Sequence, residues 1–371
     1  MKEYIIITSA VLVLCFTSSA LHSEKGSIER LYSGDRNLHG INLSGVKITG
    51  TEFRNLTLTG GLFKNARIEK CSFINCVMNY ADFIGADIRG SVFSYSEMNA
   101  VSFINTTVSE SVFNYSKLPG SRFINARILR SSFSGADLSG SEIRDCDISA
   151  VNFTYSSMDR LTVINSLMRN CDFSQGHIDS GDASDSDFSG AMFKDAFLKR
   201  SLFKNSKFIM ADFSGAYMPA VWFSGSDLSG AALDRTYAAG AIFIRSNISG
   251  ARWTGSNLVF SEFNECNSVK SSFAGSKLNG SLFMKTDFSG SDFSGSDFSV
   301  IDYSREHFLS YSGQGVRVDD EKIDIIKKTG VRIISTSFKD CDFSSVKMNR
   351  IIEKKLSDDS IKNRGMILFS D

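Results

Sequence analysis

Residues that commonly supply catalytic or metal chemistry are scarce in this sequence. Its 371 residues include only 4 histidines and 2 tryptophans. No histidines have the spacing of a zinc site, and the motifs GxSxG, GxxxxGKS/T and HExxH are missing. The sequence therefore predicts that the protein is not an enzyme and has no catalytic residue, metal site, cofactor or small-molecule substrate.

An excess of one charge is also missing. Lys plus Arg and Asp plus Glu both number 41, so the formal net charge is zero. A neutral chain has no long-range field with which to attract the phosphates of nucleic acid. It also lacks the acidic excess expected of a protein that imitates DNA. The composition therefore predicts no nucleic-acid partner.

The apolar run near the N-terminus, from Tyr4 to Phe16, is too short for a comfortable transmembrane helix, which needs about 20 residues. It follows Lys2 and precedes the small residues Ser18-Ser19-Ala20. This pattern is typical of an export signal, so we expect a signal peptide at 1–20 and a periplasmic or secreted protein. Two alternatives stay open: a type III secretion leader, and an uncleaved segment that is buried or anchors the chain to a membrane.

What the sequence does have is a period of five residues. It contains 31 Phe and 29 Gly but only 2 Pro, which suggests repetition. From Leu38 to Phe308, residues whose numbers end in 3 or 8 are large and apolar, except Ala183, Ala238 and Ser268. Between Ala66 and Ser296, all 47 residues whose numbers end in 1 or 6 are Ala, Ser, Cys, Thr, Gly or Val, except Leu161. Neither an α-helix nor a plain strand has this period.

The remaining positions must turn the chain. Numbers ending in 0 or 5 are rich in Gly and Asn, such as Gly40, Gly60 and Asn65, which best tolerate the positive φ of tight turns. Within one repeat the small and the large residue are two apart, so both point inward from a short extended segment. Residues 38–308 are therefore expected to form one solenoid.

Runs such as Ala136–Gly140 (ADLSG) and Ser226–Gly230 (SDLSG) resemble the motif A(D/N)LxG of the pentapeptide-repeat family. This resemblance implies an all-β fold, a right-handed quadrilateral β-helix with four pentapeptides and about twenty residues per coil. Residues 38–308 would then make about 13 coils. Members of this family include type III effectors and a DNA-mimicking branch that binds gyrase.

The phenylalanines support the four-sided coil independently. Between Phe53 and Phe293, 20 of the 25 residues whose numbers end in 3 are Phe. Residues whose numbers end in 8 are mostly Leu, Ile or Met until about residue 188. A twenty-residue coil keeps the two classes on separate walls, whereas coils of fifteen or twenty-five residues would mix them.

The pattern weakens in places. Ala183 lacks the large side chain of its position, which predicts a looser or bulged coil at 181–185. Residues 21–37 are expected to be an N-terminal lead-in or cap, 309–332 an insertion with a short helix at 321–328, 333–349 a resumed coil and 350–371 a C-terminal cap or tail. A role of residues 309–371 in dimerisation is the alternative to capping.

Six cysteines follow the predicted signal peptide, and every one occupies a small inward position. This placement favours a packing role, as a substitute for Ala or Ser, over a nucleophile, a metal ligand or a disulfide. They are Cys71, Cys76, Cys146, Cys171, Cys266 and Cys341.

Outward positions should be polar, so apolar exceptions are candidate binding residues. Residues twenty apart stack on one wall, and two neighbouring columns form what we call the apolar patch: Phe197, Leu202, Tyr217, Trp222, Tyr237 and Ile242. A weaker candidate is the isoleucine column of Ile84, Ile104 and Ile124. Such ladders either brace adjacent coils or form a protein-protein interface, including that of a homodimer.

The sequence thus favours a non-catalytic bacterial pentapeptide-repeat scaffold, exported from the cell, that binds a protein partner through the outer walls of the solenoid. The alternative is a type III-type secreted effector that acts in a host cell. A DNA-mimicking gyrase-binding protein fits less well, because the chain is neutral and carries an export-like N-terminus.

Overall fold

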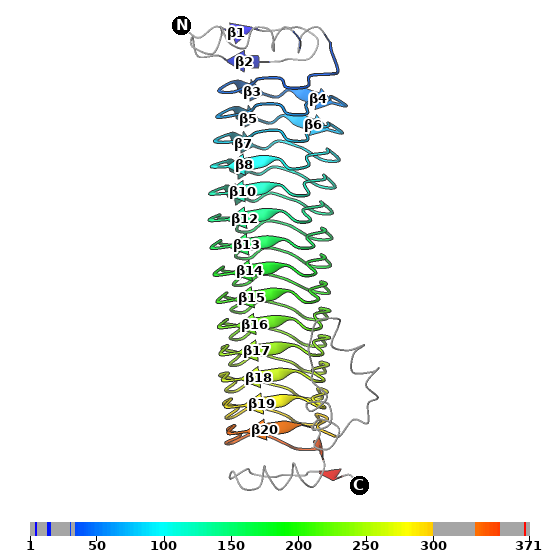
Figure 1. Ribbon diagram of the computed structural model, residues 1–371, viewed down its shortest axis with the longest axis vertical. Coiled ribbons are helices and arrows are strands. Elements are labelled where there is room, and N and C mark those ends of the chain that lie inside the picture. The colour runs from blue at the N-terminus through cyan, green and yellow to red at the C-terminus, as the bar shows by residue number, and fades with distance from the viewer. Residues whose placement is uncertain are drawn as a thin grey trace. The chain divides into compact units, whose positions relative to one another are not determined.

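The computed structural model describes residues 34–299 and 331–348, and elsewhere only Arg30 and strand residues 4–5, 13–15 and 367–368. The chain divides into two compact units, Met1–His177 and Ile178–Asp371. Within each unit, coils of twenty residues follow one another along the chain (Figure 1). Residues 34–299 contain short strands, bridges and turns but no helix. No helix among the described residues is long and apolar enough to cross a membrane.

Each coil has four walls, and each wall is one pentapeptide. The first, second, third and fourth walls are those that contain Ile48, Phe53, Leu58 and Phe63, respectively, together with the residues twenty positions apart from each. Residues twenty apart lie side by side in parallel, as Ile48 does with Ile68 and Phe203 with Phe223. The backbone N–H of Leu38 donates to the carbonyl of Thr57 at 2.7 Å, and the same contact recurs along the walls. The predicted all-β fold with twenty-residue coils is confirmed.

In the first unit, strands occur on three of the four walls. The first wall holds β3 (Lys47–Thr49), β5 (Arg67–Glu69), β7 (Asp87–Arg89), β9 (Thr107–Ser109) and β11 (Arg127–Leu129). The second wall holds β4 (Glu52–Arg54) and β6 (Ser72–Ile74). The fourth wall holds β8 (Ser102–Ile104), β10 (Arg122–Ile124), β12 (Glu142–Arg144) and β13 (Thr162–Ile164).

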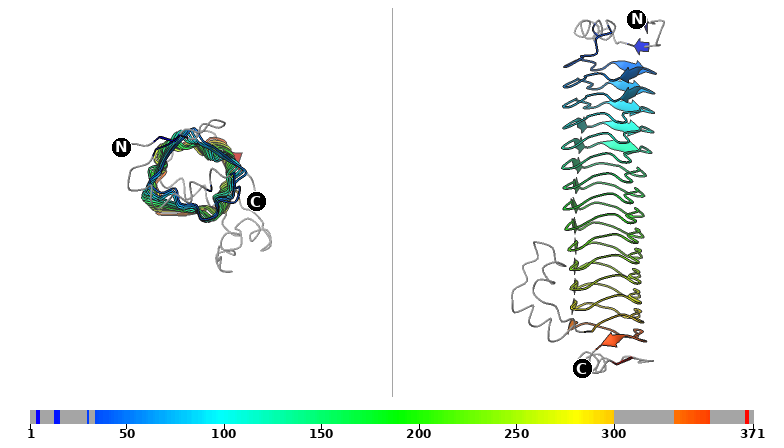
Figure 2. Two further views of the ribbon diagram at one scale, coloured as in Figure 1. Left: turned by 90° about the horizontal axis from the view of Figure 1, so that it is seen from above. Right: turned by 90° about the vertical axis from the view of Figure 1, so that its right-hand side faces the viewer.

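In the second unit, the strands of the repeat gather on the fourth wall, where neighbours lie one above another (Figure 2). They are β14 (Asp182–Ser184), β15 (Leu202–Lys204), β16 (Trp222–Ser224), β17 (Ile242–Ile244), β18 (Glu262–Asn264), β19 (Leu282–Met284) and β20 (Arg332–Ile334). Phe283 pairs with Ile333, so the repeat resumes on the same wall after residues 300–330. β21 (Lys347–Met348) pairs with β22 (Ile367–Leu368).

The interior is filled by the large residues of all four walls. On the second wall the rings of Phe53 and Phe73 stack with centroids 4.5 Å apart, and on the fourth wall Phe63 and Phe83 stack at 4.7 Å. The two stacks meet edge to face, with Phe63 and Phe73 at 6.1 Å. Both arrangements are favourable for aromatic rings. The separate phenylalanine stacks expected from the sequence are therefore present.

The corners between walls have left-handed backbone, as the Gly and Asn positions predict. Asn55 has φ 56° and Gly60 φ 65°, but Tyr95 and Tyr115 adopt φ 61° and 58° at equivalent corners. The left-handed region costs a non-glycine residue roughly 1 kcal/mol or more. The repeated turn therefore imposes this conformation even on bulky side chains.

The looser coil predicted at 181–185 was wrong. β14 pairs with β15 in regular register, and Ala183 lies opposite Phe203. Phe203, the neighbour of Ala183 on the next coil, also meets the ring of Phe188 from the next wall edge to face at 6.5 Å. Since aromatic side chains from the next wall and the next coil are close by, the backbone needs no bulge.

The ends of the chain are described only in part. Within the predicted signal peptide, β1 (Tyr4–Ile5) and β2 (Val13–Cys15) pair antiparallel, and β2 pairs antiparallel with β3. The rest of residues 1–20, most of 21–37 and the predicted helix at 321–328 lie outside the described residues. So does the predicted cap at 350–371, except β22.

Candidate functional site

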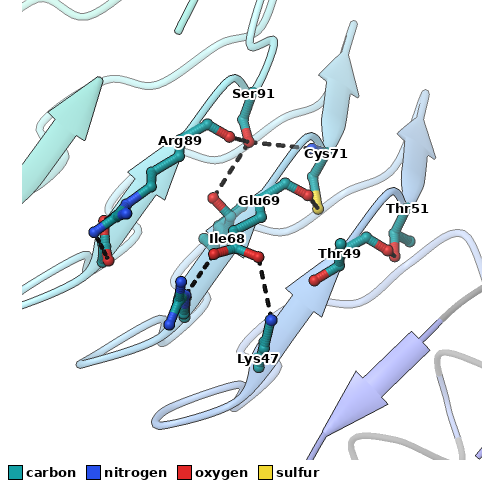
Figure 3. Close-up of polar contacts among 10 residues, drawn as sticks. Lys47, Thr49, Thr51, Ile68, Glu69, Cys71, Arg89 and Ser91 are labelled. Carbon is teal, nitrogen blue, oxygen red and sulfur yellow. Dashed lines mark hydrogen bonds and ion pairs between the residues drawn. The ribbon is translucent and has the colours of Figure 1, made fainter. Parts of the chain in front are cut away.

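The small inward residues form hydrogen-bonded ladders between coils. Ser91 Oγ accepts from the backbone N–H of Cys71 at 3.1 Å and lies 3.4 Å from the Ile68 carbonyl, to which it can donate (Figure 3). On the outer side, Lys47 Nζ pairs with Glu69 at 3.2 Å, between β3 and β5, one coil earlier. Serine is thus favoured in this position because a hydroxyl satisfies buried backbone groups that Ala would leave unbonded.

The six described cysteines occupy the same position as these serines. All are buried and none is in a disulfide. Cys171 Sγ donates to the carbonyl of Ile148 at 2.8 Å, as a serine would. Burial raises the pKa of Cys171 to about 12 and that of Cys146 to about 11. A buried, protonated thiol is a poor nucleophile. The burial of all six side chains confirms the predicted packing role.

The outer walls carry no obvious chemistry among the residues that the structure describes. They contain no group of three or more His, Cys, Asp and Glu side chains that could hold a metal ion. A shallow hollow of about 510 Å³ contains Lys194, Asp195, Asp212 and Arg235 beside Gly215. Partial burial raises the pKa of Asp212, but hydrogen bonds from Ser214 and Lys194 outweigh this effect and hold the pKa below its ordinary value. These groups neutralise one another.

The apolar patch lies on the third and fourth walls of the second unit. Phe197, Tyr217 and Tyr237 form a column on the third wall, with ring centroids 6.1 and 5.1 Å apart. Leu202, Trp222 and Ile242 are direct neighbours on the fourth wall, in β15, β16 and β17. The two columns belong to adjacent walls, so the patch folds around a corner.

Four members of the patch are well exposed. Their exposed fractions are 38% for Phe197, 43% for Leu202, 40% for Tyr217 and 43% for Trp222. Tyr237 and Ile242 are half-buried. Exposed apolar side chains that form a contiguous patch can mark a site of protein-protein interaction.

The isoleucine column is placed on the fourth wall of the first unit. Ile104 and Ile124 are direct neighbours in β8 and β10, and Ile84 occupies the equivalent position one coil earlier. All three are half-buried. Such neighbours pack against one another along the sheet, which favours a bracing role for this column.

Sequence reasoning missed several apolar residues on the outer surface. On the fourth wall of the second unit, Ile244 and Met284 are half-buried and Ile334 is 42% exposed. Each of these residues directly follows the inward residue of its pentapeptide. Together they form one column of positions twenty residues apart, which could have been recognised in the sequence although polar residues interrupt it. Tyr80 and Met210, both at corners, were missed as well, and at 69% each they are the most exposed large apolar side chains among the described residues.

The sequence profile described as Pentapeptide repeats matches eight copies, at residues 62–94, 109–145, 184–218, 223–258 and 269–299. A search of curated proteins found no significant match. Among solved structures, the chain is similar to HetL, a pentapeptide repeat protein involved in heterocyst differentiation regulation from the cyanobacterium Nostoc. That match has 19% identity, covers 64% of this chain and 94% of HetL, and has a TM-score of 0.33.

Two further structures show how general the likeness is. QnrB1, a plasmid-mediated fluoroquinolone resistance protein, has 20% identity over 59% of this chain and 97% of its own, with a TM-score of 0.30. The A-module of the Azotobacter vinelandii mannuronan C-5 epimerase AlgE4 has 8% identity over 94% of both chains, with a TM-score of 0.24. Such likenesses carry no argument about function. The repeat profile and the twenty-residue coil together show that this chain belongs to the pentapeptide-repeat family.

Proposed function

We propose that this chain is a non-catalytic, exported bacterial scaffold that binds a protein partner through the outer walls of the solenoid. The observation that carries the proposal is the exposure of Phe197, Leu202, Tyr217 and Trp222 on neighbouring coils. Trp and Tyr are the residues that most often anchor protein interfaces. The apolar patch is the proposed contact surface.

The patch differs from the parts of the outer walls that carry charged side chains. Elsewhere, outward side chains on adjacent coils form ion pairs, such as Lys117 with Glu97 at 3.2 Å and Arg130 with Glu110 at 2.9 Å. Exposed pairs of this kind contribute little to stability but keep a wall soluble. The six residues of the patch are uncharged and form no such ion pairs. This difference supports the proposal that the patch is a protein-binding surface.

The positions of the thiols and carboxylates support the proposal that the chain is not a catalyst. The described thiols lie inside the coils, and in the hollow discussed above the Asp212 carboxylate is held by Lys194 and by the backbone N–H of Ser214. A catalytic site needs a pocket in which such groups converge on a substrate. The scaffold proposal requires none.

Two variants test the contact surface. Replacing Tyr217 and Trp222 with Glu should abolish cross-linking to the partner in the producing cells, because a buried charge opposes docking. Met210→Glu is the matched control, since Met210 is more exposed, at 69%, and lies on a different corner. Circular dichroism should show the same β-structure in all variants. Unchanged cross-linking by the double variant would contradict the proposal.

Export is tested separately by fractionating the cells and sequencing the mature N-terminus. Cleavage after or near Ala20 supports the exported scaffold. Appearance of the chain inside a contacted host cell would replace it with the effector alternative. An intact cytoplasmic chain that co-purifies with gyrase would replace it with the gyrase-binding alternative.

A further inference from the structure

The fourth wall of the second unit is apolar over more of its length than the patch alone. Its outward side chains form two columns, one before and one after the inward residue of each strand. The first column contains Asp182, Leu202, Trp222, Ile242, Glu262 and Leu282. The second contains Ser184, Lys204, Ser224, Ile244, Asn264, Met284 and Ile334. The first wall of the same unit, by contrast, presents Asp187, Lys207, Asp227, Asn247, Asn267 and Asp287 in its first column.

This wall is also suited to face-to-face contact. β14 to β20 are three-residue strands in unbroken parallel register, so their backbone groups bond within the sheet. The corners beside Trp222 are Ala220 and Gly225, and the corner before Ile242 is Gly240. These small corners leave the middle of the wall, at Trp222 and before Ile242, open to a second flat sheet, whereas larger corner residues border the wall elsewhere, at Arg200, Asn205, Arg245, Phe260, Glu265 and Lys285.

We propose that the occupant of this wall is a second copy of the chain, packed face to face with its coils running in the same direction. This proposal rests on the function proposed above and specifies the protein partner that binds the fourth wall of the second unit. A two-fold axis along the stack places the first column of one copy opposite the second column of the other. Ile242 then faces Ile244 of the second copy, and Leu282 faces Met284 of the second copy.

The charges of the wall are complementary in this arrangement. Each strand carries at most one charged outward side chain between residues 182 and 284, so no two like charges face each other. Lys204 faces Leu202 of the second copy and lies one coil, about 4.8 Å, from Asp182 of the second copy. Both side chains are exposed. The symmetry creates this ion pair twice.

The reverse orientation fits less well. If the coils of the second copy ran in the opposite direction, centred between Trp222 and Ile242, Leu202 would face Glu262 of the second copy. Leu282 would likewise face Asp182 of the second copy, so two aliphatic side chains would be covered by carboxylates, which is costly. In the parallel arrangement the one charged side chain that faces an aliphatic one is Lys204, whose long stem can cover Leu202 while its ammonium group reaches Asp182. The charge pattern therefore selects the parallel arrangement.

The dimensions of the wall predict a weak dimer. The strands β14–β20 span six spacings of about 4.8 Å, roughly 29 Å, and five residues across the wall span roughly 16 Å. Contact would cover roughly 460 Å² on each copy, at the low end of specific interfaces. We expect a dissociation constant on the order of micromolar.

Sedimentation equilibrium of the full chain, from about 1 to about 100 μM, tests the dimer. A reversible monomer–dimer equilibrium is expected. Ile242→Glu should raise the dissociation constant at least about 100-fold, because the charge would face Ile244 of the second copy. Met210→Glu should leave it unchanged. A chain that stays monomeric at the highest concentration overturns the proposal.

A charge exchange tests the orientation. Lys204→Asp and Asp182→Lys should each weaken the dimer about five- to tenfold, and the double variant should return to within about threefold of the parent. Two weakening effects that simply add would overturn the parallel arrangement. Lys277→Glu, an exposed lysine on the third wall, is the matched control and should have no effect.

Cross-linking of a mixture gives an independent readout. An Ile242→Cys chain mixed with an Ile244→Cys chain should form the mixed disulfide faster than either forms a disulfide with itself. The six described native cysteines are buried, and the parent chain controls for any other thiol. Absence of the mixed disulfide overturns the arrangement. If every variant is monomeric but Tyr217 and Trp222 are still needed for cross-linking to a different protein, the dimer is wrong and the scaffold function stands.

Discussion

Substitutions of Trp253 test the packing of the interior. They remove a buried N–H group that has no hydrogen-bond acceptor among the described residues, which stabilises the fold, and they also remove buried volume, which destabilises it. The side chain is fully buried in the second-wall stack, 6.1 Å from the parallel ring of Phe273 and 5.3 Å from the perpendicular ring of Phe243. Its indole N–H has no hydrogen-bond acceptor among the described residues. An unsatisfied buried donor costs about 1–3 kcal/mol.

Trp253→Phe removes this donor and leaves a ring that matches the rest of the stack. The lost volume, roughly 40 Å³, costs about 1 kcal/mol at the usual value per unit of cavity volume. The free energy of unfolding should therefore stay the same or rise by up to about 2 kcal/mol. Urea unfolding followed by circular dichroism measures the change.

Trp253→Leu separates the two effects. It removes the same donor but leaves a cavity of roughly 60 Å³, about 1.5 kcal/mol, and loses ring contacts worth about 0.5–1.5 kcal/mol each. This variant should be less stable than Trp253→Phe by about 1–3 kcal/mol. A loss of more than 2 kcal/mol in Trp253→Phe would refute the reasoning, because it would mean that the N–H is satisfied or that the indole shape is required.

Two further predictions concern the corners and the thiols. Gly140→Ala should cost about 1 kcal/mol, because Gly140 has φ +65° in open space, whereas Gly135→Ala should cost clearly more, because its Cβ would lie 2.5 Å from Cε1 of Tyr115. Equal losses in urea unfolding would contradict this. Burial raises the pKa of Cys171 to about 12, so above about pH 8.5 the folded chain holds a proton that the unfolded chain releases. The free energy of unfolding should therefore fall as pH rises, by up to about 1.4 kcal/mol per pH unit. In Cys171→Ser it should fall less between about pH 8 and 10.5. If the two proteins lose stability in parallel over this range, the burial of this thiol is contradicted.

The solenoid could be predicted from the sequence because each position of the pentapeptide has one physical task. The register came from Phe, which returns at Phe53, Phe73 and Phe93 and stacks there. The role of the cysteines followed from the same rule. A position that must be small and must hydrogen-bond a carbonyl accepts Cys171 as readily as Ser91.

The prediction failed where one wall depends on another. Ala183 suggested a defect because its own pentapeptide lacks a large side chain, but the rings of Phe188 and Phe203 meet beside it. Contacts between walls depend on ring orientation, which the repeat pattern does not contain. The looser coil was therefore wrong although the fold was right.

The candidate surface was predicted in outline. Columns twenty residues apart correctly placed Trp222 beside Ile242, but which side chains are exposed depends on the corners between walls. Ile244 and Met284 were missed because Asn264 separates them in their column. Their relation to the patch becomes visible only when both outward columns of one wall are considered together.

Site-specific photo-cross-linking from position 222 tests the central claim, that the outer wall carries a binding surface, most directly. A benzophenone amino acid would replace Trp222 in one chain and Met210 in a control chain, both produced in the native cells. We expect a discrete cross-linked species from position 222, either with another protein or with a second copy, and none from position 210. No product from position 222, or the same products from both positions, would contradict the claim.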